Sequence, residues 1–135
     1  MTALRPLWKR DQRGAAALEF ALAAPLLLMF ILGITQLGLL FFANAGLRSS
    51  VAEGARYATI YPRPTDEQIK AKMTQSRFGI DPALVTGPTL THGTSDGAQY
   101  LDISMSYATP LDFVFIETPP ITISVTRRAF VQPTT

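Results

Sequence analysis

The stretch Arg13–Phe42, RGAAALEFALAAPLLLMFILGITQLGLLFF, decides the fold of this chain. After Arg13, its only charged residue is Glu19. In a helix, about 20 apolar residues cross the hydrocarbon core of a bilayer, so the stretch predicts a transmembrane helix. Pro25 removes one helical hydrogen bond and is expected to kink or loosen that helix. A carboxylate in such a segment is costly, which makes Glu19 a candidate functional residue.

Basic residues precede the span. Residues 1–14, a basic leader, carry four basic side chains against Asp11, a net charge of +3, while the whole chain has +2. The remainder is therefore at −1, and a nucleic-acid partner is not expected. The positive-inside rule predicts a cytoplasmic N-terminus and a C-terminus outside. A secretory signal peptide cut near residues 43–45 is the alternative, but its apolar core would be unusually long.

The helical pattern continues beyond the span to about Tyr61, where prolines stop it, so residues 15–61 predict one transmembrane and stalk helix. Small residues recur in the stalk at every fourth position, which places them on one face. They are Gly46, Ser50, Gly54 and Ala58. This face is either a helix-packing site that lets a neighbouring backbone or sheet approach closely, or the seat of the chain's own head.

Residues 62–135 predict a small extracytoplasmic head. Residues 65–68, TDEQ, have the pattern of a capping box that opens a helix. This helix is expected to end at about Arg77, before Gly79, and a turn at Asp81-Pro82 follows. The Gly-, Pro- and Thr-rich residues after the turn predict at most a short strand around residues 84–91.

Two later segments, residues 99–108 and 121–131, alternate between apolar and polar residues, the pattern of half-buried strands. They are expected to pair antiparallel. Pro110, Pro119 and Pro120 make the residues between them a connection and not a third central strand. Its apolar part, Leu111–Ile116, is expected to pack against the sheet, the stalk or the membrane surface. The predicted fold class is α+β, with a long N-terminal transmembrane helix and a head containing a short helix and an antiparallel β-sheet.

No catalytic constellation is visible in the sequence. The chain has no cysteine, which excludes disulfides, thiolate metal sites and a cysteine nucleophile. His92, the single histidine, cannot anchor a zinc site alone and is predicted to be a solvated loop residue. Residues 93–97, GTSDG, predict a turn, because no lysine or helix follows to make a phosphate-binding loop. We therefore expect no enzyme, no cofactor and no metal site.

A cleavage motif opens the apolar span. Residues 13–20, RGAAALEF, resemble the processing site of type IV pilin-like proteins, in which a prepilin peptidase cuts after a glycine and the fifth mature residue is a glutamate. The resemblance places the cut between Gly14 and Ala15. The new amino group at Ala15 would lie one helical turn from Glu19. In an assembly, the Glu19 carboxylate is expected to pair with that amine on a neighbouring subunit and to set the register.

The flanking residues resemble more closely the TadE-like pseudopilins of the tight-adherence (Flp, type IVb) pilus systems. In this family a glutamate-phenylalanine pair, here Glu19-Phe20, is followed by Ala-Leu, a proline and a leucine-rich helix. A later Glu-Gly-Ala-Arg segment with an aromatic residue corresponds here to Glu53, Gly54, Ala55, Arg56 and Tyr57. The resemblance implies a minor pilin or assembly component of the inner membrane, in contact with lipid, a prepilin peptidase and other pilins.

An uncleaved single-pass membrane protein, whose head binds a partner outside the membrane, is the second hypothesis. The two hypotheses differ at the N-terminus of the mature protein, which is Ala15 after cleavage and Met1 or Thr2 without it.

Overall fold

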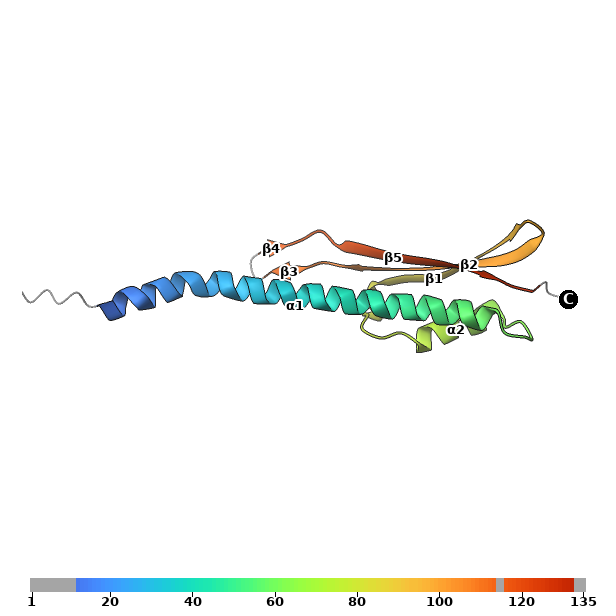
Figure 1. Cartoon of the computed structure of the whole chain (residues 1–135), viewed down its shortest axis with the longest axis horizontal. Coiled ribbons are helices and arrows are strands. Elements are labelled where there is room, and N and C mark those ends of the chain that lie inside the picture. Colours follow the sequence, from blue (N-terminus) through green and yellow to red (C-terminus); the bar gives the residue numbers. More distant parts are fainter. Residues whose placement is uncertain (1–11, 114–115, 133–135) are drawn as a thin grey trace, which may run out of the picture.

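A long helix with a sheet alongside it forms the protein, seen in a computed structural model that describes residues 12–113 and 116–132 (Figure 1). The predicted leader, residues 1–14, lies mostly outside the described residues. The described residues form two α-helices and one 3-10 turn: α1 (Gln12–Ala58), α2 (Asp66–Gln75) and η1 (Pro82–Leu84). The strands are β1 (Val85–Ser95), β2 (Ala98–Thr109), β3 (Asp112–Phe113), β4 (Ile116–Glu117) and β5 (Ile121–Phe130).

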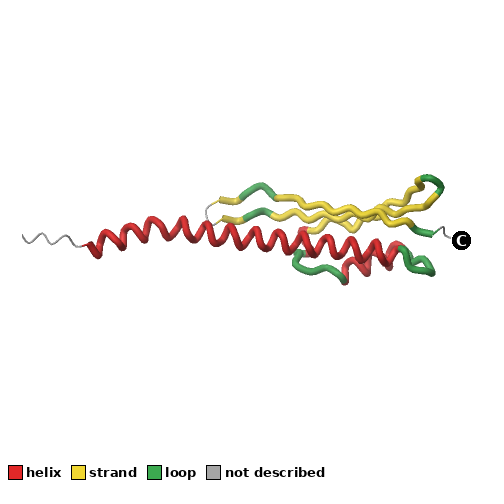
Figure 2. The backbone as a smooth tube through the Cα atoms, in the orientation of Figure 1, coloured by secondary structure: helices red, strands yellow, loops and turns green. Residues whose placement is uncertain are grey.

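The main sheet is antiparallel and has the order β1-β2-β5. β2 pairs with β5 from Tyr100↔Phe130 to Thr109↔Ile121, which confirms the predicted pairing of the two alternating segments. β3 and β4 pair separately as a small hairpin, the β3–β4 hairpin. It continues the β2 and β5 ribbon toward the N-terminal half of α1 (Figure 2). The α+β fold is thus as predicted, and the residues between β2 and β5 are not a central strand.

β1 is the main departure from the sequence prediction. It has 11 residues, where the sequence predicts at most a short strand. Its register against β2 shifts between Thr86 and Thr89, and Gly87 has a φ of +99°. This bulge accommodates Gly87 and Pro88 on an edge strand, where a missing N–H donor is tolerated. His92 lies within β1, so the prediction that it is a loop residue is wrong.

Local sequence signals around α2 and the β1–β2 turn are confirmed. The Gln68 backbone N–H donates to Thr65 Oγ1 at 3.3 Å, and the Thr65 N–H donates to Gln68 Oε1 at 2.9 Å, which is the predicted capping box. The helix ends at Gln75, slightly earlier than predicted. Asp96 and Gly97 form the tight turn with φ values of 51° and 78°. Positive φ at both positions matches the twist of a two-residue hairpin.

The core of the head lies between α1, α2 and the inner face of the sheet. In Figure 1, the sheet and α2 lie on opposite sides of the C-terminal half of α1. Its largest fully buried apolar side chains are Leu47 and Val51 from α1, Ile69 and Met73 from α2, and Leu101 and Ile103 from β2. α1 ends at Ala58, a little before the predicted Tyr61. The C-terminal half of α1 is therefore the central element of the head.

Candidate membrane-spanning and assembly helix

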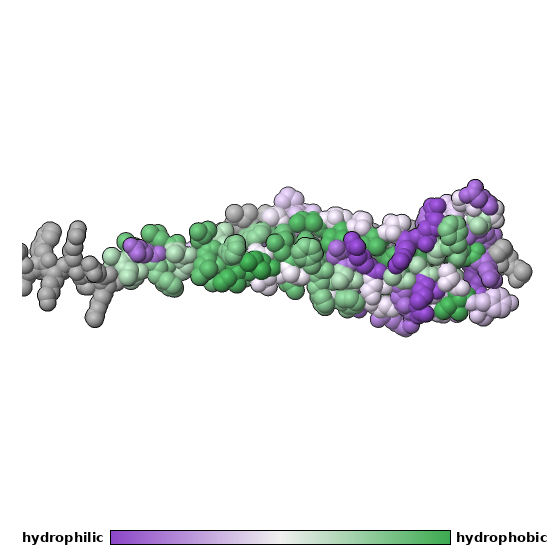
Figure 3. Space-filling view, in the orientation of Figure 1, coloured by the Kyte–Doolittle hydropathy of each residue, from purple (hydrophilic) through white to green (hydrophobic). Residues whose placement is uncertain are grey.

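Residues 14–42 of α1 expose large apolar side chains around the helix. They are Leu18, Phe20, Leu22, Leu26, Leu27, Leu28, Phe30, Ile31, Leu32, Ile34, Leu37, Leu39, Phe41 and Phe42. The surface over this half of α1 is largely hydrophobic (Figure 3). A helix that is apolar all round needs either a protein core or a lipid environment, and little of this one is buried. The helix is long and apolar enough to cross a membrane, which suggests a membrane-anchored protein.

The exposed half of α1 ends where the segment after α2 crosses it. Phe78 packs against Phe42 with ring centroids 5.4 Å apart. A Cβ atom at Gly46 would collide with the carbonyl oxygen of Phe78, so only glycine lets this backbone pass. Ala43, with 2 % of its surface exposed, is the first side chain of the buried half. Residues 43–58 thus form a second half of α1 with a different environment.

The small-residue face of α1 is covered by the head. Gly46, Ser50, Gly54 and Ala58 are all buried. A Cβ atom at Gly54 would lie 2.5 Å from Met73 Cγ, and Ser50 Oγ donates a hydrogen bond of 2.8 Å to the carbonyl oxygen of Met73. Of the two expectations for this face, the contacts observed within the chain are those of a head resting on its own helix.

The predicted family segment of α1 turns its charged residues outward and its small residues inward. Gly54 and Ala55 are buried, and Tyr57 packs at the edge of the core. Arg56 Nη2 lies 2.7 Å from Glu53 Oε1, and this hydrogen bond lowers the pKa of the Glu53 carboxyl. Lys72 Nζ of α2 lies 3.8 Å from the same oxygen. The segment therefore joins α1 to α2 by packing on one side and by charge on the other.

The predicted cleavage and registration residues lie at the opposite end of α1 from the head. Gly14, Ala15, Glu19 and Phe20 are all exposed. Ala15 and Glu19 are four residues apart in continuous helix, and thus on one face. Glu19 is the only charged residue of the sequence between Gly14 and Arg48. Within residues 12–113 and 116–132, no hydrogen bond or ion pair involves its carboxylate.

His92 joins two polar side chains at the surface of the head. Its Nε2 lies 2.9 Å from Asp66 Oδ2, and its Nδ1 lies 3.1 Å from Arg63 Nη2. The imidazole is 49 % exposed, which agrees with the prediction of a solvated residue, although the backbone is in a strand. Among the residues that the structure describes, no group of three or more His, Asp or Glu could hold a metal ion.

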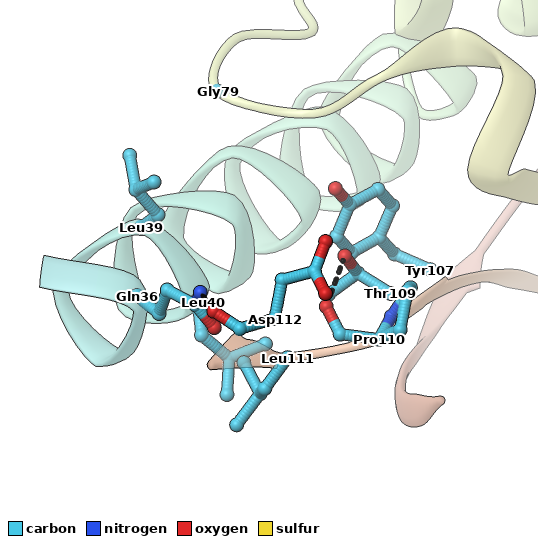
Figure 4. A pocket seen from close by; sticks show the side chains of 9 residues that line it. All are labelled: Gln36, Leu39, Leu40, Gly79, Tyr107, Thr109, Pro110, Leu111 and Asp112. Carbon is cyan, nitrogen blue, oxygen red and sulfur yellow. Dashed lines mark hydrogen bonds between the residues drawn. The ribbon is translucent and has the colours of Figure 1, made fainter. Parts of the chain in front are cut away.

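A pocket of about 320 Å³ opens where the strands meet the exposed half of α1 (Figure 4). Gln36, Leu39 and Leu40 of α1 form one wall, and the residues joining β2 to β3 form the other. The Gln36 side-chain amide donates to the carbonyl oxygen of Asp112. Its Oε1 atom is buried and has no hydrogen-bond partner in the described part of the chain. The pocket therefore marks a contact between the helix and the strand end.

Comparison with known families decides the character of the long helix. The family model described as TadE-like protein matches residues 14–56, which include the exposed half of α1 and most of the small-residue face. This part of the chain is similar to the TadE-like family. Neither the search of curated proteins nor the search of solved structures gave a match. The family match supports a protein of the tight-adherence pilus system and implies association with other pilus components, and the family is not known as enzymatic.

Sequence reasoning did not identify all the residues through which α1 contacts the rest of the chain. One row of buried side chains on α1 packs against the head. It consists of Ala43, Leu47, Val51 and Ala55, and their spacing of four residues could have predicted this buried face. The apolar run Leu111–Ile116 predicted a contact with the sheet, the stalk or the membrane surface, but nothing in the sequence indicated Gly33 and Gln36 of α1 as the partners of Phe113 and Asp112.

Proposed function

We propose that this TadE-like protein is a minor pilin, or pseudopilin, or an assembly component of a tight-adherence (Flp, type IVb) pilus. In this proposal it lies in the inner membrane with its N-terminus in the cytoplasm. A prepilin peptidase cuts it after Gly14, and the exposed half of α1 then packs into an assembly. The observation that carries the proposal is Glu19, a lone exposed carboxylate on an otherwise apolar helical surface.

The chemistry of Glu19 favours an assembly over a simple anchor. An unpaired carboxylate at the edge of a hydrocarbon core is costly, and two opposite charges removed from water together cost far less than one alone. Cleavage after Gly14 would create an amino cation at Ala15. Pairing between that amine on one subunit and Glu19 on the next would fix the axial register of neighbouring helices.

The length of the apolar surface also supports packing between helices. Residues 20–42 span about 35 Å as a helix, whereas the hydrocarbon core is about 30 Å thick. Tilting of the helix accommodates part of the extra apolar length, and contact with neighbouring apolar helices buries the remainder. The exposed side chains Leu37, Leu39 and Phe41 supply that contact surface beside the head.

Sequencing the N-terminus of the mature protein tests the cleavage step. The full chain is expressed in cells with and without an active prepilin peptidase. We expect the chain to begin at Ala15 with the peptidase and at Met1 or Thr2 without it. An intact N-terminus in the presence of the active peptidase would contradict the proposal and favour an uncleaved anchored protein.

The registration role is tested by comparing two glutamates. Glu19→Gln keeps the size of the side chain but removes the charge, and we expect pilus production to fall sharply while cleavage continues. Glu67→Gln, on the exposed first turn of α2, is the matched control and leaves pilus production unchanged. Normal pilus production by Glu19→Gln would rule out the pairing.

A further inference from the structure

The two edges of the main sheet differ in how well they could pair with another strand. The edge strand β1 contains Pro88 and a register shift between Thr86 and Thr89, features that disfavour the addition of a further strand. The other edge strand, β5, pairs with β2 along its whole length without a register shift and contains no proline. In the part of the chain that the structure describes, β5 pairs with β2 alone. β5 therefore has a long, regular free edge, at the margin of the sheet away from α2 (Figure 1).

One hydrogen bond determines which backbone groups of β5 point to its free edge. The Val131 N–H donates to the Gln99 carbonyl oxygen at 2.9 Å, and the register of β2 and β5 places these two residues directly opposite each other. Bonded and non-bonded positions alternate in an antiparallel pair, so Val125 and Ile123 also bond toward β2. The intervening residues turn their N–H and C=O groups outward; they are Thr122, Ser124, Thr126, Arg128 and Phe130. The free edge thus presents backbone donors and acceptors that β2 does not satisfy.

Apolar side chains of β5 lie along this edge on the face of the sheet toward α1. Ile123 and Val125 are partly buried and pack against the core, and Ile121 is 38 % exposed. Arg127 is the next residue on the same face and is exposed. An added strand would place alternate side chains beside these residues, because side chains two positions apart share one face. Apolar side chains beside Ile123 and Val125 would therefore extend the core of the head.

The charges of β5 favour an acidic partner. Arg128 is already held, because its Nε and Nη2 donate to the two carboxylate oxygens of Asp102 at 2.8 Å and its guanidinium lies 3.7 Å from the centre of the Tyr100 ring. Arg127 lies opposite Ile103 of β2, and within residues 12–113 and 116–132 it has no hydrogen bond or ion pair. An acidic side chain directly across from Arg127 on an added strand would stabilise the pairing, and a basic one would repel it. A second copy of β5 would bring further like charges, so charge favours a different, acidic strand.

We propose that the free edge of β5 accepts an extended segment of another protein as an added antiparallel strand, with an acidic residue beside Arg127 and apolar residues beside Val125 and Ile123. From its N-terminus, such a segment reads acidic, any residue, apolar, any residue, apolar. Backbone hydrogen bonds to the outward groups of β5 hold the segment, and the alternate side chains select it. The inference uses only residues of the head, so it depends on neither cleavage after Gly14 nor a membrane span.

Peptide binding to the full chain in detergent micelles tests this edge. The probe is a dye-labelled synthetic peptide, Thr-Glu-Thr-Val-Thr-Val-Thr, and the control peptide has lysine in place of the glutamate. Fluorescence anisotropy should show that the parent binds the glutamate peptide about tenfold more tightly than the lysine peptide. Arg127→Glu should reverse this preference, because the charge across from the variable residue is then negative. Equal binding of the two peptides by the parent, or an unchanged preference in Arg127→Glu, would overturn the proposal.

A proline at the free edge tests the backbone contact separately from the charge. The Thr126 N–H points away from β2, so Thr126→Pro removes an outward donor and keeps the bonds to β2. This variant should bind the glutamate peptide at least about tenfold more weakly. Thr126→Val, the matched control, retains the N–H and should bind like the parent.

Amide hydrogen exchange of the parent locates the bound peptide. The outward amides of Ser124 and Thr126 should exchange more slowly when the glutamate peptide is bound, whereas the lysine peptide should leave them unchanged. Unchanged exchange at both amides with the glutamate peptide bound would overturn the proposed site. Dimers of the full chain that form without peptide and that Thr126→Pro disperses would overturn the proposed partner in favour of a second copy of the chain.

Discussion

The two halves of α1 have the same backbone but opposite surroundings. Residues 14–42 carry large apolar side chains that remain exposed, whereas residues 43–58 bury small and medium side chains under the head. The first half offers bulk in every direction, so its surface suits lipid or other helices. The second half has one face of small residues, on which the backbone of Phe78 passes at Gly46 and the thioether of Met73 packs at Gly54. The comparison shows that residue size, as well as hydrophobicity, divides this helix into an exposed half and a half buried under the head.

Truncating a leucine should give the largest difference in unfolding free energy between the two halves of α1. Leu47 is fully buried and Leu39 is 61 % exposed. Leu47→Ala leaves a cavity and should lower the free energy of unfolding of the head by about 2–5 kcal/mol. Leu39→Ala should leave it nearly unchanged. Chemical denaturation of the full chain in detergent micelles, followed by near-ultraviolet circular dichroism, measures both, and equal losses would contradict the division.

A charge in the exposed half should act on the membrane and not on the head. Leu26 is 72 % exposed, and a lysine at the centre of a span raises the free energy of insertion by about 2.5–3.5 kcal/mol. Leu26→Lys should therefore reduce the fraction of chain that resists carbonate extraction from membranes. Thr122→Lys, on exposed β5, should extract like the parent. A destabilised head in Leu26→Lys in micelles would show that the halves are not independent.

Two glycines of α1 provide a smaller and more specific contrast. A methyl group at Gly46 would collide with the Phe78 carbonyl oxygen, whereas nothing lies within 4 Å of the position at Gly38. Gly46→Ala should destabilise the head by about 1–3 kcal/mol, the usual cost of overpacking. Gly38→Ala should be neutral or stabilising through helix propensity. Gly54→Ala should cost less than Gly46→Ala, because its methyl group meets a side chain, Met73 Cγ and Sδ, and not a backbone carbonyl. Thermal melting in micelles ranks all three.

The smallest effect concerns the charges of the buried half. The Arg56 hydrogen bond lowers the pKa of Glu53, so the pair stabilises the head above the carboxyl's unfolded pKa and loses this contribution as the pH falls through the lowered pKa. Arg56→Gln should therefore melt slightly below the parent at neutral pH, and the difference should vanish in acid. Melting temperatures recorded from neutral to acidic pH give this difference. A gap that grows in acid would contradict the assignment.

Much of this fold could be predicted because its signals are local. The capping box at Thr65, the alternation of residues 99–108 and the apolar run before Phe42 each depend on neighbouring residues. The length of β1 could not be predicted, because Gly87 and Pro88 are poor strand formers that only an edge strand with a bulge tolerates.

The candidate site could be predicted only in part, for a related reason. The spacing of Gly46 and Gly54 shows that something approaches α1 closely, yet a neighbouring subunit and the chain's own head both need the same small residues. The structure adds Phe78 and Met73 as the groups that approach within the chain. The apolar run Leu111–Ile116 predicted that this connection packs on something, but the contact of Phe113 with Gly33 joins residues far apart in sequence, so the sequence did not identify the partner.

Because α1 is one continuous helix, its exposed half is rigidly connected to the head. A straight run of 47 helical residues would be about 70 Å long, and no break in helical structure separates the exposed half from the half inside the head. If residues 14–42 cross a membrane as proposed, a change in their tilt moves the far tip of the sheet sideways, by more the farther a residue lies from the membrane. Pro25 lies within the exposed half of α1, on the N-terminal side of the head, so a bend at Pro25 would move the whole head together.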